Sequence, residues 1–323
     1  GASPGVSGYP LVASERPDSS RRIPCVRAMI RPIILLAALL SCTSAAVSGA
    51  SPSLKPSLRP ATTLRLSGGA APSVPQPSAT KSKQTIHDGR EVYVLADSDA
   101  ISAAVAESVA AIGKECIASQ GTFTMCVPGG SIVKALSKLP PDSMDFSKVH
   151  VFFANERIGE YKCYKGAMDS FVDKCGIPHA NVHKVGEGEP AEVAAAYEAE
   201  MLKCVAKNDK GIPVMDLVLL GTGEDGHVGS IHPNSDEVMQ SGKGKVILPI
   251  DKGGKKSIAA SMDVFCASSR IILSAAGAGR APMVKAALSG DFEEWTVPAG
   301  LVKSEAGATA WLCDQESVAT LNH

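Results

Sequence analysis

The chain has 323 residues, of which 45% are hydrophobic and 20% are charged, and its formal net charge is −1. This composition is that of a globular protein and excludes a mainly disordered or fibrous chain. A net charge near zero also argues against nucleic acid as the main partner, because proteins that bind it usually present a strongly basic face.

Three segments precede the first periodic apolar pattern. Residues 1–28 contain Pro, Ser and Arg without periodicity, and we expect an extension that is upstream sequence or poorly ordered. Residues 29–50 combine a positive charge, a short apolar run and small residues, which is typical of a signal peptide. Residues 51–85 hold basic but no acidic residues and are rich in Ser and Pro, so they resemble a transit peptide or a disordered segment.

The order of these segments predicts a two-part address that leads to a plastid stroma. Secretion with a disordered linker, or a cytosolic protein, is the alternative. The apolar run of residues 33–40 is too short for a membrane span, which needs about 20 residues, so we expect no membrane association of the mature form.

From residue 86 to 323 strands and helices alternate. Apolar, branched runs predict strands at 92–95, 122–127, 149–153, 215–220, 270–276 and 308–312. Helical spacing predicts helices at 100–119, 132–139 and 191–206, with another that ends at 288. Such alternation is typical of an α/β fold, so we expect a single three-layer α/β/α domain around a mainly parallel sheet.

The first candidate binding loop follows the strand at 122–127. Gly129 and Gly130 would let backbone N–H groups turn toward an anion at a helix start, and Ser131 would add a hydroxyl. The alternative is a tight turn in which Ser131 caps the helix.

The next candidate follows the strand at 149–153. Arg157, in the segment Asn155-Glu156-Arg157, could clamp a phosphate or carboxylate through two N–H groups. The alternative is an ordinary surface ion pair.

The strongest signal follows the strand at 215–220. There Asp225, Gly226 and His227 belong to a glycine-rich turn at the carboxyl end of a strand, where open α/β sheets bind ligands. His227 could act as a general base with Asp225 fixing its tautomer, whereas the alternative is a histidine that caps the next helix. His232 is a second imidazole five residues on, but no tight ligand spacing supports a metal site.

A fourth loop, Gly277 to Arg280, repeats the pattern of strand, glycine and cation. Arg280 alone could be a solvated surface residue. Cationic or N–H-bearing loops at several strand ends together predict a site for a small phosphorylated molecule.

In these motifs the chain resembles the 6-phosphogluconolactonase family. The family's S-G-G-S, D-E-R and G-x-G-x-D-G-H-x-x-S-[LI]-F-P patterns match residues 128–131, 155–157 and 221–233, and its G-x-G-K-A and W-x-x-D patterns match 277–281 and 311–314. The resemblance implies the fold shared with glucosamine-6-phosphate deaminases and ribose-5-phosphate isomerases. The deaminases carry Asn-Glu-Pro soon after the histidine, where this chain has Ser230-Ile231-His232-Pro233, which favours the lactonase.

The resemblance implies hydrolysis of 6-phospho-D-glucono-1,5-lactone to 6-phospho-D-gluconate in the oxidative pentose phosphate pathway, with no cofactor. His227 would remove a proton from water, and Asp225 would support it. The loop Gly129–Ser131, Gly226 and Arg280 would bind the substrate, and Arg157 would shape or brace the site. We expect a monomer or a weak homodimer.

Departures from the family pattern affect three of these places. The aspartate of D-E-R is Asn155, and the lysine of G-x-G-K is Arg280. An arginine usually opens the strand in R-[IV]-T, where this chain has Ser257, so we expect Lys256 to take over its phosphate contact. Another sugar-phosphate deaminase or isomerase of the same fold, or a catalytically weak sugar-phosphate-binding protein, is therefore the alternative function.

Overall fold

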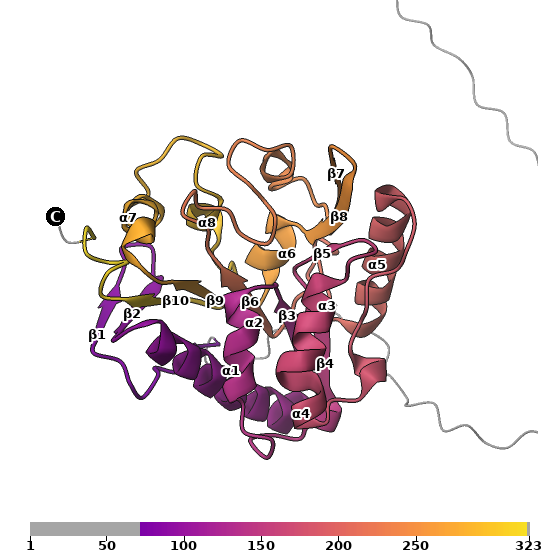
Figure 1. The fold of residues 1–323 in the computed structure, drawn as a ribbon, viewed down its shortest axis with the longest axis horizontal. Coiled ribbons are helices and arrows are strands. Elements are labelled where there is room, and N and C mark those ends of the chain that lie inside the picture. Colours follow the sequence, from indigo (N-terminus) through magenta and orange to yellow (C-terminus); the bar gives the residue numbers. More distant parts are fainter. Residues whose placement is uncertain (1–71, 322–323) are drawn as a thin grey trace, which may run out of the picture. The chain divides into compact units, whose positions relative to one another are not determined.

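The computed structural model describes residues 72–321, which form a domain around a seven-stranded sheet with strand order β1-β2-β10-β9-β6-β3-β4 (Figure 1). All neighbouring pairs are parallel except β1 with β2. The strands are β1 (Ser82–Thr85), β2 (Glu91–Leu95), β3 (Phe123–Val127), β4 (Val149–Phe153), β6 (Leu217–Gly221), β9 (Arg270–Ala275) and β10 (Ala308–Asp314).

Both faces of this sheet are buried. In β6, Leu217 and Leu219 face one hydrophobic core, whereas Val218 and Leu220 face the other, as the alternation of side chains in a strand requires. A strand with two buried faces consists almost entirely of apolar residues. For this reason the sequence alone predicted β6.

Helices cover the two faces. The first core takes its helical residues from α1 to α4, whereas the second takes them from α5 to α8. Figure 1 shows α1 on one side of β2, β9 and β10, and α7 and α8 on the other. The helices are α1 (Ser98–Gln120), α2 (Ser131–Ala135), α3 (Lys162–Ala167), α4 (Asp173–Cys175), α5 (Pro190–Cys204), α6 (Met262–Ala267), α7 (Ala281–Ser289) and α8 (Pro298–Leu301).

Shorter helical turns complete the chain. A π-helical turn at Met168–Val172 joins α3 to α4, and 3₁₀ turns lie at Leu136–Lys138, Phe146–Lys148, His179–Asn181, Val238–Gln240 and Ala278–Arg280.

A smaller antiparallel sheet stands beside the main one. It has the order β5-β8-β7, with β5 at Asn155–Arg157, β7 at Ile247–Lys252 and β8 at Lys255–Ala260. Only Ala154 separates β5 from β4, and its carbonyl accepts a hydrogen bond from Ala260 N at 2.8 Å. The small sheet therefore begins directly after the carboxyl end of β4.

The predicted fold class is confirmed: the domain is α/β with a mainly parallel sheet between helical layers. The predicted strands and helices are present, with boundaries shifted by a few residues. The helix predicted at 132–139 begins one residue earlier and passes into a 3₁₀ turn after Ala135. The last strand, β10, lies inside the sheet between β2 and β9.

The prediction that residues 72–85 belong to a disordered or transit-like segment was wrong. Residues 82–85 form edge strand β1, paired with β2, and Val74 is buried at 3% exposure. Arg270 Nε donates to Ser73 O at 2.7 Å, so the segment also satisfies a buried guanidinium. The four side chains of β1 are exposed, so the strand has no apolar pattern to reveal it.

The proposed extension, signal peptide and the rest of the transit-like segment lie outside the described residues. Within residues 72–321, none of the helices combines the length and apolar character that crossing a membrane would require. All cysteines in this part of the chain are unpaired thiols.

The earlier start of the domain gives a direct test. A chain that begins at Ile86 should be less stable than one that begins at Pro72 by about 2–5 kcal/mol, because it lacks the burial of Val74 and leaves Arg270 without a carbonyl partner. Urea unfolding followed by circular dichroism measures this difference. Equal free energies of unfolding would show that residues 72–85 contribute nothing to the fold.

Candidate active site

The four predicted loops follow four neighbouring strands. In the sheet, β9, β6, β3 and β4 stand side by side and run parallel, so their carboxyl ends meet at one edge. From β3 the chain continues outward to β4, whereas from β6 it continues in the opposite direction to β9. The boundary between β3 and β6 is thus a topological switch point, where open α/β sheets form ligand crevices.

A cleft of about 430 Å³ lies at this point. It brings together predicted residues from two loops, Ser131 after β3 and Arg280 after β9, and it is also lined by Gly221 and Thr222 of the loop that carries His227. Hydroxyl groups of Ser98, Ser102 and Ser274 add polar surface. A polar cleft with a guanidinium suits a small anionic ligand.

The loop before α2 depends on glycine. Gly130 has φ 78° and ψ −147°, a backbone conformation that side chains other than hydrogen essentially forbid. Gly130, and not Ser131, occupies the N-cap position, so the alternative in which Ser131 caps the helix is wrong. Ser131 is the first helical residue and lines the cleft, while Gly129 packs against Cys163.

Arg280 is held at the cleft by two backbone carbonyls. Its Nε donates to Thr222 O at 2.8 Å and its Nη1 to Ala276 O at 2.7 Å. A guanidinium has five N–H donors, so two such contacts fix its plane and leave donors for a ligand. The loop itself is fixed by Asp314, whose Oδ2 accepts from Gly277 N at 2.8 Å.

His227 is paired with Asp225. The imidazole Nδ1 lies 2.6 Å from Asp225 Oδ1, and the same oxygen accepts from His227 N at 3.1 Å. Because an ionised carboxylate only accepts, Nδ1 carries the proton and Nε2 keeps its lone pair when the ring is neutral. A Cβ on Gly223 would come within 2.4 Å of both partner side chains, so only glycine fits there.

The lowered pKa of Asp225 is consistent with its pairing with His227. Partial burial acts to raise its pKa, but the hydrogen bonds from the His227 backbone and imidazole outweigh burial, and the net pKa is lowered. Asp225 is therefore ionised near neutral pH. His232 joins the pair, with Nδ1 at 3.6 Å from Asp225 Oδ2 and its ring centroid 4.6 Å from that of His227.

The chain makes a tight turn directly after His227. Val228 and Ile231 exchange backbone hydrogen bonds, and Ser230 between them has φ 67°. Asn155 Nδ2 donates to Ser230 Oγ at 2.8 Å, so the loop after β4 holds the loop after β6. This contact gives Asn155 a positioning role.

In the same strand, Glu156 anchors the start of α3, whereas Arg157 forms the surface ion pair named above as the alternative. Glu156 is fully buried, and its carboxylate accepts from Cys163 N at 3.1 Å and Tyr164 N at 2.7 Å at the start of α3. Arg157 Nη1 pairs with Glu160 at 3.1 Å and is 40% exposed. Hydrogen bonds to a charged group stabilise by about 1.5–3 kcal/mol each, so Glu156 is a strong local anchor.

Of the predicted site residues, only Ser131 and Arg280 line the cleft. The others do not: Gly129, Gly130, Arg157, Asp225, Gly226, His227 and Lys256. Lys256 Nζ pairs with Glu189 at 2.6 Å, and the β5–β8 register puts Ser257, and not Lys256, opposite Arg157. Gly226 is buried against Val297, and its carbonyl accepts from Ala299 N at 2.9 Å. The structure therefore does not bring Lys256 or Gly226 to the cleft surface.

Sequence reasoning gave no role to Asp314 or Glu156 and set His232 aside. The signals were present, because all three belong to the quoted motifs. Asp314 contacts Gly277, which is distant in sequence. Glu156 and His232 contact residues five to eight positions away, through loop conformations that the sequence pattern does not reveal.

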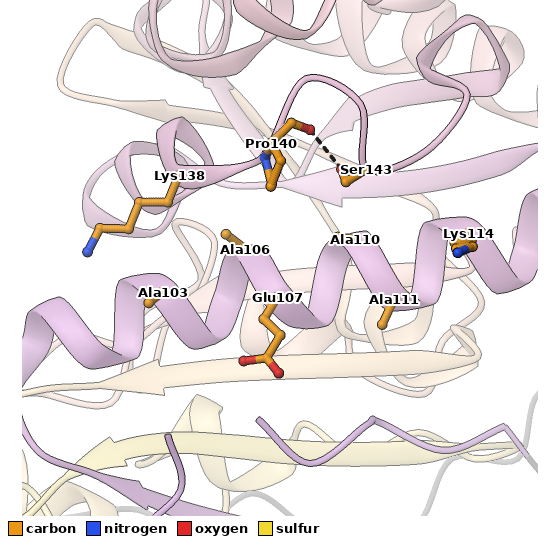
Figure 2. A pocket seen from close by; sticks show the side chains of 9 residues that line it. All are labelled: Ala103, Ala106, Glu107, Ala110, Ala111, Lys114, Lys138, Pro140 and Ser143. Carbon is orange, nitrogen blue, oxygen red and sulfur yellow. Dashed lines mark hydrogen bonds between the residues drawn. The ribbon is translucent and has the colours of Figure 1, made fainter. Parts of the chain in front are cut away.

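A second hollow, of about 470 Å³, lies along α1 (Figure 2). Four of its nine lining residues are alanine, and the carboxylate of Glu107 accepts hydrogen bonds from Ser78. Lys138 at its rim is paired with Asp99 at 2.6 Å. It therefore lacks the converging polar groups that distinguish the cleft at the strand ends.

Comparisons with known proteins show the family of the chain. The family model described as glucosamine-6-phosphate isomerases/6-phosphogluconolactonase matches residues 96–311. The chain is 33% identical over 247 residues to 6-phosphogluconolactonase 3, chloroplastic, of Arabidopsis thaliana, covering 72% of this chain and 74% of the relative. It is 31% identical to probable 6-phosphogluconolactonase 4, chloroplastic, of Oryza sativa subsp. indica, covering 72% of this chain and 77% of the relative.

Solved structures show the same fold. The 6-phosphogluconolactonase from Trypanosoma brucei superposes with a TM-score of 0.64 at 21% identity, covering 74% of this chain and 100% of that one. The devB protein gives a TM-score of 0.61 at 23% identity, covering 71% of this chain and 98% of that one.

Proposed function

Because this chain belongs to the glucosamine-6-phosphate isomerase/6-phosphogluconolactonase family, we propose that it hydrolyses 6-phospho-D-glucono-1,5-lactone to 6-phospho-D-gluconate. The observation that carries the proposal is the Asp225–His227 pair at 2.6 Å, on the same loop as two residues that line the cleft holding Arg280. A base and an anion-binding cation beside one crevice are what lactone hydrolysis of a phosphorylated sugar needs.

In this proposal the phosphate of the substrate binds in the cleft. Arg280 donates to its oxygens, and Ser131 with the backbone N–H groups of Gly129–Ser131 completes the cradle. Asn155 braces this side of the site from the β5 strand. Lys256 is left out, because it pairs with Glu189.

The proposed reaction uses His227 as general base. Its Nε2 takes a proton from water as the oxygen attacks the lactone carbonyl carbon, which forms a tetrahedral oxyanion. Collapse of this intermediate breaks the bond between the carbonyl carbon and the ring oxygen, and the imidazolium returns its proton to that oxygen. Asp225 holds Nδ1–H and stabilises the imidazolium.

The base assignment is tested with freshly generated lactone in a coupled assay. His227→Ala should lower kcat by about 10²- to 10⁴-fold, the usual contribution of a general base. The matched control is His179→Ala, since His179 is also paired with an aspartate, at 2.9 Å, but on the surface after α4. This control should hydrolyse the lactone as fast as the wild type.

Two results would contradict the proposal. Equal rates for His227→Ala and wild type would remove the catalytic role of this histidine. A wild type that binds 6-phosphogluconate but does not exceed spontaneous hydrolysis would instead indicate a sugar-phosphate-binding protein.

The phosphate site is tested by comparing two cations. Arg280→Ala should raise KM by about 10- to 100-fold, because a charge-assisted hydrogen bond to the phosphate is lost. Lys256→Ala should leave KM unchanged. If both variants raise KM alike, Lys256 contacts substrate and the placement of the phosphate needs revision.

We place the protein in a plastid, since the residues before the domain resemble a targeting sequence and the plant relatives are named chloroplastic. Import into the stroma through a signal peptide and a transit peptide is the specific form of this proposal. A fluorescent protein fused after residues 29–71 should accumulate in plastids. Fluorescence confined to the secretory route would exclude the plastid.

A further inference from the structure

A second group of ionisable side chains lies at the edge of the main sheet, away from the cleft. His183, Glu200 and Cys204 each offer a ligand atom, and these atoms lie within 4.8 Å of one another. His183 follows the turn at His179–Asn181, and its N donates to Val151 O of edge strand β4 at 2.9 Å. Glu200 and Cys204 share one face of the last turns of α5, four residues apart.

The spacing of the three atoms is compatible with a shared metal ion as well as with direct hydrogen bonds. His183 Nδ1 lies 3.3 Å from Glu200 Oε1, and Cys204 Sγ lies 4.0 Å from the same oxygen. Atoms that bind one tetrahedral zinc ion at about 2.0–2.3 Å are about 3.3–3.7 Å apart. The Cys204 Sγ lies slightly farther from Glu200 Oε1 than this range, so metal binding requires a shift of one of these side chains.

The other nitrogen of His183 has the partner that a metal-binding imidazole needs. His183 Nε2 lies 3.2 Å from His150 Nδ1, and its ring stacks on Phe152 with centroids 4.0 Å apart. With Nε2–H donated to His150, the lone pair of Nδ1 points at Glu200 and Cys204. Outer hydrogen bonds of this kind fix the tautomer of metal ligands.

We propose that His183, Glu200 and Cys204 bind a zinc ion that joins the end of α5 to the segment beside β4. A nitrogen, an oxygen and a sulfur donor select zinc over magnesium or calcium, which prefer oxygen alone. Glu200 is 43% exposed, so solvent supplies the fourth ligand. The site is separate from the cleft, because His150 lies near the amino end of β4 and the cleft lies at the carboxyl ends of the strands.

Cobalt substitution tests the proposal on the full chain. After chelation and dialysis, added Co²⁺ should give one near-ultraviolet thiolate-to-cobalt charge-transfer band per chain, and Zn²⁺ should abolish it by displacing the cobalt. Cys204→Ala should lose this band. The band distinguishes the site from Asp225, His227 and His232, which could also hold a metal but contain no thiol.

The matched control is Cys266→Ala, since Cys266 is another partly buried thiol but belongs to neither metal-binding group. It should keep the band. His150→Ala should keep the band and weaken zinc binding by about 10- to 100-fold, the usual effect of losing an outer hydrogen bond. Glu200→Gln, a change at a half-exposed position, should weaken zinc binding at least as much without loss of fold.

Absence of a thiolate band in the wild type would overturn the proposal. So would a band of unchanged intensity in Cys204→Ala, or zinc affinity that is the same in Glu200→Gln and wild type. Circular dichroism of each variant separates loss of the site from loss of the fold.

Discussion

The parallel pairing of β6 with β3 on one side and β9 on the other is the constraint on which the site depends. Both faces of these strands are buried, so polar and charged groups near them can reach solvent only at the strand ends. From β3 the chain continues to β4 and from β6 it continues to β9, on opposite sides, and this change of direction across the sheet separates the loops at this edge. A crevice forms there without any special sequence, and the loops decide what it binds.

The loops at the strand ends are held together by hydrogen bonds between them. Asn155 holds Ser230 from across the sheet edge, Thr222 O orients Arg280, and Asp314 fixes the start of the loop that carries Arg280. Each contact joins segments distant in sequence. The result is a guanidinium positioned by backbone carbonyls and a histidine positioned by the exposed carboxylate of Asp225. Support of this kind keeps side chains within a fraction of an ångström of one geometry.

The sequence predicted the main sheet because its strands are apolar runs, and it predicted three of the site loops because glycines and a histidine follow those runs. It failed where the signal is not periodic. Strand β1 is polar and exposed, and β5 is only three residues long. Lys256 was predicted because it adjoins the position of an arginine in the family pattern. Adjacent residues of a strand point to opposite faces, however, and the residue paired with Arg157 is Ser257. The cluster of His183, Glu200 and Cys204 spans two elements with no short spacing, so only the fold reveals it.

The departures from the family pattern affect charge more than shape. Asn155 serves its observed role with an amide donor, and an aspartate at the same place could accept from the Ser230 hydroxyl instead. Ser257 is a larger change, because an arginine there would stand directly opposite Arg157 in the β5–β8 pair. Arg157 already pairs with Glu160, so much of its charge is compensated. Arg280 is hydrogen-bonded to neutral carbonyls, so no carboxylate compensates its charge in these contacts, and it can attract an anion in this cleft together with Lys134.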